Sequence, residues 1–179
     1  PHGALSMMVL EDGPLFVADT HVWTQPTPEQ IAQTALGAAR HARRFGLEPK
    51  LAFCSQSQFG TQADGPGKRL RAAMAILDEL GTDFAYEGEM KVDAALDASL
   101  RDKLLPGGRL TGAANILVFG SGDAASATRN VLKMKAAALE VGPLLMGMGN
   151  RAHIVTPGVT PRGLLNMGVI AGTPVSNYG

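Results

Sequence analysis

Hydroxyl and amide side chains gather in residues 55–61, SQSQFGT, directly after the apolar run KLAFC. Ser55, Ser57 and Thr61 carry hydroxyl groups, which donate hydrogen bonds to phosphate oxygens. Loop hydroxyls more often cap helices or turns, and this structural role is the alternative interpretation. The segment therefore predicts a loop that is able to hold a phosphate-bearing ligand.

Charged side chains offer a second kind of chemistry. Arg129 and Lys133 lie four residues apart, so on a helix they would share one face and could contact an anionic ligand. A solvated helix face is the alternative interpretation of this pair. Glu87, Glu89 and Asp93 could act as general acids or bases, but a solvated loop and a helix N-cap explain them more simply.

Cys54 is the only cysteine of the chain, which excludes an internal disulfide and a cysteine-built zinc site. Its place at the end of an apolar run favours an inert, buried thiol in a reducing cytoplasm. His21 and His153 have no further metal ligand at a suitable spacing, so no metal site is expected. A structural and a functional role stay open for both histidines.

Alternating strand and helix patterns must position these groups. Apolar runs predict strands at residues 4–10, 14–19, 50–54, 83–88, 115–120, 142–147 and 152–155, the first two joined as a hairpin. Helical spacing and end signals predict helices at residues 27–46, 68–81, 93–104, 123–140 and 160–173. Because strand and helix alternate about every 25 residues, we expect an α/β three-layer sandwich with a largely parallel sheet.

In such a sheet, the loops that leave the carboxyl ends of the strands meet at one edge, where ligands bind. We therefore expect residues 55–61, 87–93 and 120–126 to converge. Two of these loops lead into helices, whose free N–H groups favour an anion. Capping signals begin two other helices, at Thr27 with Gln30 and at Thr160.

Composition narrows the class of protein. The chain has 179 residues, with 16 basic and 16 acidic side chains, and the resulting net charge of zero argues against a nucleic-acid or membrane-surface role. No apolar run approaches the length of a membrane-spanning helix. The first residues lack both a starting methionine and the pattern of a signal peptide, so we expect a piece of a longer protein.

Eight stretches, taken together and in order, resemble the phosphate acetyltransferase (phosphotransacetylase) family over essentially the whole chain. They are FVADT, TPEQIAQTAL, ARRFGLEPKLA, SQSQFGT, EGEMKVDAAL, GAANILVFGSGDAASA, VGPLLMGM and HIVTPGVTPRGLLNM. The resemblance implies a phosphotransacetylase-like fold, of the architecture seen in isocitrate and isopropylmalate dehydrogenases. It also implies that residues 1–150 form a second subdomain, and that residues 151–179 return to a first subdomain that precedes Pro1.

The same resemblance locates the positions where catalysis would occur. Active family members have a Ser-Arg-Gly stretch followed by an aspartate; the serine and arginine meet the acyl group and phosphate, and the aspartate assists the thiol. Here these positions hold Thr156, Pro157 and Gly163. Proline supplies no phosphate clamp and glycine no base, so we expect no catalytic residues.

The Thr156-Pro157 pair, with GEM and DAA in residues 88–90 and 93–95, resembles one branch: the phosphotransacetylase-like C-terminal domain of the large bacterial NADP-dependent malic enzymes. This implies a non-catalytic domain that responds to acetyl-CoA and helps to build a homo-oligomer. Its partner would be the malic enzyme catalytic domain of the same chain, which converts malate to pyruvate with NADP and Mg or Mn.

Some positions depart from that branch as well. Gln56 and Gln58 stand where histidine and asparagine are usual, and Lys91-Val92 replaces a His-Gly pair. The residues expected to contact the ligand are Ser55, Ser57, Gln58, Thr61, Ser126, Arg129 and Thr156. Two alternatives are an active phosphate acetyltransferase with rearranged residues and a purely structural dimerisation module.

Overall fold

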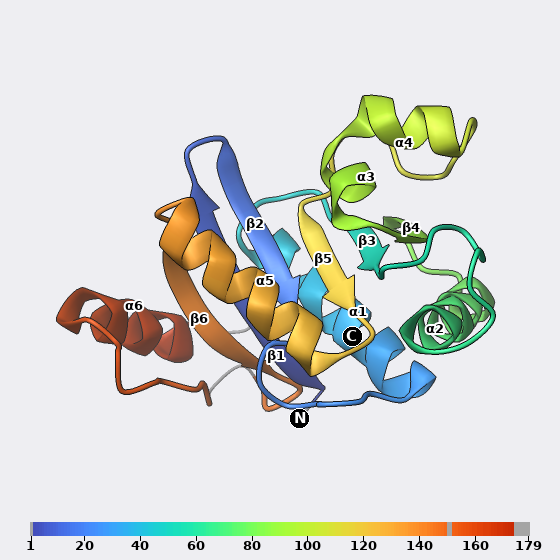
Figure 1. The fold of residues 1–179 in the computed structure, drawn as a ribbon. Helices are drawn as coiled ribbons and strands as arrows, with labels where there is room; N and C mark the ends of the chain where they lie inside the picture. Colours follow the sequence, from blue (N-terminus) through green and yellow to red (C-terminus); the bar gives the residue numbers. More distant parts are fainter. Residues whose placement is uncertain (1, 150–151, 174–179) are drawn as a thin grey trace.

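The computed structural model describes residues 2–149 and 152–173, and it shows a mixed sheet covered by helices on both faces (Figure 1). The elements are β1 (Gly3–Leu10), β2 (Gly13–Ala18), α1 (Pro28–Arg44), β3 (Lys50–Cys54), α2 (Pro66–Leu80), β4 (Ala85–Met90), α3 (Val92–Leu96), α4 (Ala98–Leu104), β5 (Ile116–Phe119), α5 (Gly122–Lys135), β6 (Leu139–Met146) and α6 (Pro161–Gly172). This confirms the predicted three-layer α/β sandwich.

The sheet has the strand order β4-β3-β5-β2-β1-β6. Neighbours from β4 to β2 pair in parallel, whereas β1 pairs antiparallel with both β2 and β6. Among the described strands, β1 alone therefore runs against the others, and the sheet is largely parallel as expected. The reversal is the β1–β2 hairpin, which closes where Leu10 pairs with Gly13, and Gly13 has the positive φ of 127° that glycine tolerates.

Two apolar layers fill the space between the sheet and its helices. One face of the sheet packs against α1 and α2, with Phe16, Phe53 and Leu70 in the interior. The other face packs against α3 and α5, with Val17, Met90 and Ala125 inside. In Figure 1, α5 crosses the near face of the sheet and α1 lies behind it.

Local capping fixes where α1 and α6 begin. The Thr27 hydroxyl accepts from the Gln30 N–H at 3.3 Å, and the Gln30 side chain accepts from the Thr27 N–H at 2.9 Å, which is the predicted capping box. Thr160 caps α6 in the predicted way, because its hydroxyl accepts from the Gly163 N–H at 3.0 Å. Both predictions rest on contacts between residues three positions apart.

Three predicted elements differ from the structure: one helix is split, one is shorter and one strand does not form. Residues 93–104 form two helices, because Asp97 leaves the helical conformation and its carboxylate caps α4 through the Ser99 and Leu100 N–H groups. The helix expected at 123–140 ends at Lys135, since Leu139 and Glu140 already pair with β1. Residues 152–155 form no strand; the Ile154 N–H donates to the Pro143 carbonyl, a single bond instead of a ladder.

The proposed division at residue 150 falls on residues 150 and 151, which lie outside the described part of the chain, as do 174–179. What the structure does describe is α6, which packs beside β6 through the buried Met167. Leu164, Leu165 and Val169 on the same helix are 54–67% exposed. Within residues 2–149 and 152–173, no helix is both long and apolar enough to cross a membrane.

Candidate functional site

The carboxyl ends of β2, β3, β4 and β5 bring their loops to one edge of the sheet. The Ser55 N–H, after β3, donates to the Met90 carbonyl at the end of β4 at 2.8 Å. The Gly122 N–H, after β5, donates to the Thr24 carbonyl in the loop after β2 at 3.0 Å. Arg69 in α2 reaches the Gly120 carbonyl at 2.8 Å. The structure thus brings the three expected loops together, with the β2 loop as a fourth.

Loop 55–61 is fastened to the end of β4 by one carboxylate. Ser57 is almost fully buried, and its hydroxyl donates to the Glu89 carboxylate. The Gly60 N–H donates to the same oxygen, Oε1, at 3.0 Å, and the Arg71 guanidinium lies 3.0 Å from it. Phe59 and Gly60 turn the chain with φ values of 47° and 86°, so that their N–H groups point back toward β4.

The electrostatics of Glu89 follow from these contacts. Burial by itself raises the pKa of this carboxyl, but the hydrogen bonds from Ser57, Gly60 and Arg71 outweigh burial and leave the pKa below its ordinary value. Glu89 is therefore ionised. The sequence-based interpretation of a solvated loop is wrong here, because Glu87 is also buried and accepts from the Arg109 N–H at 2.7 Å. Both glutamates have structural partners that the local sequence does not reveal.

The other expected ligand residues of this loop take different places. Ser55 is partly buried, and its hydroxyl accepts from the Ser57 N–H at 3.2 Å. Gln58 and Thr61 close a turn, with the Gln58 N–H donating to the Thr61 hydroxyl at 3.1 Å. The Thr61 residue is exposed and the Gln58 residue partly so. Ser57 therefore faces inward, whereas Gln58 and Thr61 stay accessible from solvent.

Arg129 is the centre of a buried ion pair rather than part of a solvated face. Its Nε and Nη2 atoms donate to the two oxygens of Glu140 at 2.5 and 2.7 Å. Ser6 donates to Glu140 at 2.9 Å, and Lys133 lies 3.5 Å from it. Burial raises the pKa of Glu140, but Arg129 outweighs burial and lowers it. The Arg129 charge is already neutralised internally; its contact with a ligand, like that of the half-buried Ser126, stays a prediction.

The segment with the altered catalytic positions follows β6, the edge strand at the opposite end of the strand order from β4, and so lies far from loop 55–61. Thr156 follows β6, and its carbonyl accepts from the Val159 N–H at 2.9 Å. Pro157 is exposed, and Gly163 lies in the capped first turn of α6. β5, β2 and β1 separate β6 from β3, a distance of about 19 Å at the usual strand spacing. The described structure therefore does not bring Thr156 together with Ser55, Ser57, Gln58 or Thr61.

Asp19 helps to shape the carboxyl edge, and sequence reasoning did not single it out. Only 4% exposed, it accepts from the N–H groups of Ala4, His21, Val22 and Trp23 at 2.5–3.2 Å, and so it fixes the loop after β2. A cavity of about 160 Å³ opens between this loop and the first turn of α5. Burial, followed by the charge of Arg129, lowers the pKa of His21, which lines the cavity. An acidic residue at the end of an apolar strand was the available signal.

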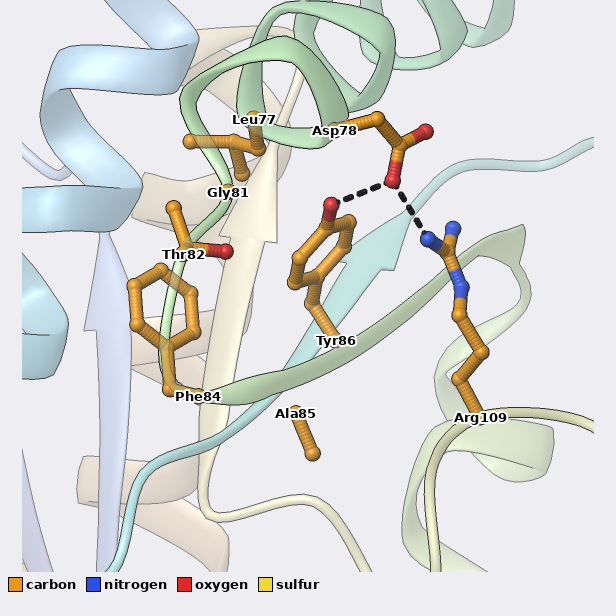
Figure 2. A pocket seen from close by; sticks show the side chains of 8 residues that line it. All are labelled: Leu77, Asp78, Gly81, Thr82, Phe84, Ala85, Tyr86 and Arg109. Atoms are coloured by element: carbon orange, nitrogen blue, oxygen red, sulfur yellow. Dashed lines mark hydrogen bonds and ion pairs between the residues drawn. The ribbon is translucent and has the colours of Figure 1, made fainter.

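A larger cavity, of about 270 Å³, lies at the opposite end of β4 (Figure 2). Asp78 accepts from the Tyr86 hydroxyl at 2.5 Å and from Arg109 Nη1 at 2.6 Å. The Arg109 guanidinium also lies 4.6 Å from the centre of the Tyr86 ring. The hydrogen bond from Tyr86, followed by that from Arg109, lowers the pKa of Asp78. These groups satisfy one another, so we place the candidate site at the carboxyl edge.

Cys54 ends β3, directly before loop 55–61. Its thiol is buried, and this burial raises its pKa far above the ordinary range. This matches the expectation of an unreactive thiol. Among the described residues, no three His, Cys, Asp or Glu side chains lie close enough together to hold a metal ion.

Comparison with known proteins identifies the fold and the family. The model of the phosphate acetyl/butaryl transferase family matches residues 2–172. A phosphotransacetylase from Staphylococcus aureus superposes with a TM-score of 0.85 at 24% identity, over 94% of this chain and 52% of that one. One from Streptococcus pyogenes gives 0.88 at 23% identity, with the same coverage of both chains.

Relatives of known name are of two kinds. An NAD-dependent malic enzyme of Rhizobium meliloti is 41% identical over 94% of this chain, and an NADP-dependent malic enzyme of Salmonella typhimurium is 40% identical over 94%. A phosphate acetyltransferase of Synechocystis is 30% identical over 94% of the chain. The chain spans only 22% of the two malic enzymes and 24% of the acetyltransferase. With a match over nearly its whole length, this chain belongs to the phosphate acetyl/butaryl transferase family.

Proposed function

We propose that this chain is the phosphotransacetylase-like domain of a malic enzyme, and that it binds acetyl-CoA as an effector without transferring the acetyl group. The observation that carries the proposal is the chemistry at Thr156, Pro157 and Gly163. Resemblance to active family members places a serine, an arginine and an aspartate there. The two relatives of 41% and 40% identity are malic enzymes, which supports the choice of branch.

The altered positions lack the groups that acyl transfer to phosphate requires. An arginine holds phosphate with two charged hydrogen bonds, whereas Pro157 has no donor at all. Gly163 has no side chain, and its N–H is already bonded to the Thr160 hydroxyl. Loss of a phosphate clamp and a general base removes several powers of ten in rate. Ligand binding depends less on these two groups than catalysis does, so the domain can still bind acetyl-CoA.

The carboxyl edge supports binding of an anionic ligand. Glu89 holds loop 55–61 from the side of β4 through hydrogen bonds, while Gln58 and Thr61 stay accessible from solvent. The helix that follows, α2, begins at Pro66, and its N-cap residue Gly65 supplies no side-chain cap in the described structure, so the N–H groups of Gly67 and Lys68 have no side-chain partner there. Lys68 in the first turn adds a positive charge. This combination suits the phosphates of a coenzyme A thioester.

The parent protein would oxidatively decarboxylate malate to pyruvate with a dinucleotide and a divalent metal, Mg or Mn, all held by a catalytic domain of the same polypeptide. We propose NADP as the dinucleotide, on the resemblance to the NADP-dependent branch. Identity does not decide this point, since the NAD-dependent and NADP-dependent relatives are 41% and 40% identical to this chain. We also propose a homo-oligomer, for which the exposed Leu164, Leu165 and Val169 of α6 offer an apolar surface.

Titration of the full-length enzyme with acetyl-CoA tests the proposal. We expect a heat of binding together with a change in malate kinetics, because an effector regulates only when it binds one state better than another. Gln58→Ala should weaken binding about fivefold, the effect of losing about 1 kcal/mol from one hydrogen bond. Gln33→Ala, at an exposed position of α1, is the matched control and should leave affinity unchanged. No heat and unchanged malate kinetics would reject the proposal.

An active phosphate acetyltransferase is the second candidate, because the Synechocystis acetyltransferase is also a relative and Thr156 keeps a hydroxyl. The assay is formation of acetyl phosphate from acetyl-CoA and phosphate by the full-length protein. We expect no turnover above background. Turnover that disappears in Thr156→Val would establish the second candidate in place of the first.

A further inference from the structure

We propose that Glu89 is a positioning residue that holds loop 55–61 in its ligand-binding shape. The proposal rests on the proposed function in one respect: it takes this loop as part of the acetyl-CoA site. It adds a specific role for a buried carboxylate that neither the sequence pattern nor the family match assigns.

Loop 55–61 makes several of its hydrogen bonds to Glu89. The Glu89 carboxylate accepts from the Ser57 hydroxyl and from the Gly60 N–H at 3.0 Å, while the Glu89 carbonyl accepts from the Phe59 N–H at 2.6 Å. Three loop residues within a span of four thus use Glu89 as their acceptor. Without it, a hydroxyl and an N–H group at the turn would lose their partner.

The negative charge of Glu89 is part of the arrangement. Arg71, one turn into α2, lies 3.0 Å from Oε1 and is itself only 31% exposed. A Cβ atom added to Gly67 would lie 3.4 Å from the same oxygen, so the carboxylate sits against the first turn of α2. Oε2 is buried and has no hydrogen-bond partner among the described residues. The donors on Oε1, from Ser57, Gly60 and Arg71, lower the pKa of Glu89 and keep it ionised.

Burial distinguishes this role from catalysis. Glu89 is 0% exposed, and Ser57, at 2%, covers it from the loop side. A ligand at the edge of the sheet meets the outer side chains of the loop, not this carboxylate. Glu89 therefore acts on a ligand through the loop and exchanges no proton with it.

The same strand supplies a matched control. Glu87, two residues earlier on β4, is also buried and accepts from a loop N–H, that of Arg109 at 2.7 Å. Its loop, residues 105–113, passes close to Lys50 at the amino end of β3, away from the carboxyl edge. Both glutamates are buried and both accept a loop N–H, but only Glu89 also pairs with an arginine and holds the proposed ligand loop.

The experiment compares Glu89→Ala with Glu87→Ala in the full-length protein, using hydrogen exchange without ligand and calorimetric titration with acetyl-CoA. We expect Glu89→Ala to speed exchange of residues 55–61 about tenfold and to weaken acetyl-CoA binding about tenfold. Glu87→Ala should instead speed exchange of residues 105–113 and leave affinity within about twofold.

Glu89→Gln keeps an acceptor for Ser57 and Gly60 but removes the charge, and it replaces Glu89→Ala if that variant does not fold. It should restore part of the protection of residues 55–61, because the acceptor returns without the charge that Arg71 contacts, and a general loss of stability would not produce this rescue. Equal effects of the Glu87 and Glu89 variants on affinity, or unchanged exchange of residues 55–61 in Glu89→Ala, would overturn the proposal. If the unmodified protein binds no acetyl-CoA, the proposed function fails, and the exchange data alone decide the role of Glu89.

Discussion

Two arginine–carboxylate pairs in this molecule have similar distances and opposite surroundings. The side chains of Arg129 and Glu140 approach to 2.5 Å with only 10% and 8% of their surfaces exposed. Those of Arg109 and Asp78 approach to 2.6 Å with 50% and 52% exposed. Water screens the second pair, whereas the first has given up its hydration for mutual contact. Burial rather than distance therefore sets how much each pair matters for stability.

The largest expected effect is that of Arg129→Ala. This change leaves Glu140 buried without its main partner, and it should lower the free energy of unfolding by about 3–5 kcal/mol. Urea denaturation followed by circular dichroism measures the loss. The double variant Arg129→Met, Glu140→Leu should recover much of it, because two apolar side chains need no partner. A loss below about 1 kcal/mol in the single variant would mean that the pair behaves like a surface pair.

Acid should act on the buried pair in a defined direction. The pKa of Glu140 is lowered in the folded protein, so its stabilising contribution is fully present above the unfolded-state pKa and is lost as the pH falls through the folded-state pKa. Stability measured from neutral pH down to about pH 3 should therefore fall less steeply at the acid end in Glu140→Gln than in the parent. Parallel curves for the two proteins would contradict this assignment.

The exposed pair should respond weakly. Arg109→Ala is expected to cost about 0.2–1 kcal/mol, and the loss should shrink as salt is added, because the pair is half exposed. Part of the cost reflects the contact of the guanidinium with the Tyr86 ring. Denaturation at low and high salt separates the two contributions. A loss as large as that of Arg129→Ala would contradict the conclusion that burial sets how much each pair contributes to stability.

Lys133 gives the smallest effect and refines the comparison. Its ammonium group lies 3.5 Å from Glu140, but its side chain is 43% exposed, so it joins a buried pair from the solvent side. We expect Lys133→Ala to cost about 0.5 kcal/mol or less. If the cost is several times larger, then Arg129 alone does not neutralise Glu140.

Local signals predicted the fold well, because they depend on residues close in sequence. The capping box of Thr27 and Gln30 and the hairpin turn at Gly13 both involve neighbours, and both are correct. The site was less predictable. The partner of Ser57 is Glu89, 32 positions away, and that of Arg129 is Glu140, on a different element. A glutamate in a loop pattern looks solvated until the fold shows which donors surround it.

The boundary errors have two different physical origins. Residues 136–140 carry helix-favouring alanines, yet Leu139 and Glu140 join β6 because pairing with β1 and the contact with Arg129 outweigh local preference. At Asp97 the prediction joined two helices into one. Aspartate often caps helices, but this one lies within an apolar pattern that favoured one continuous helix. Tertiary pairing decides the first case and side-chain capping the second.

The buried thiol of Cys54 has a practical consequence. Because it is the only cysteine and its thiol stays protonated and covered, a thiol reagent can modify it only in molecules whose interior has opened. Because Cys54 lies one residue before loop 55–61, its thiol is an intrinsic probe of local opening in this part of the molecule. The rate of modification counts openings of the sheet edge where the ligand loop begins, and it needs no label beyond the chain's own sulfur.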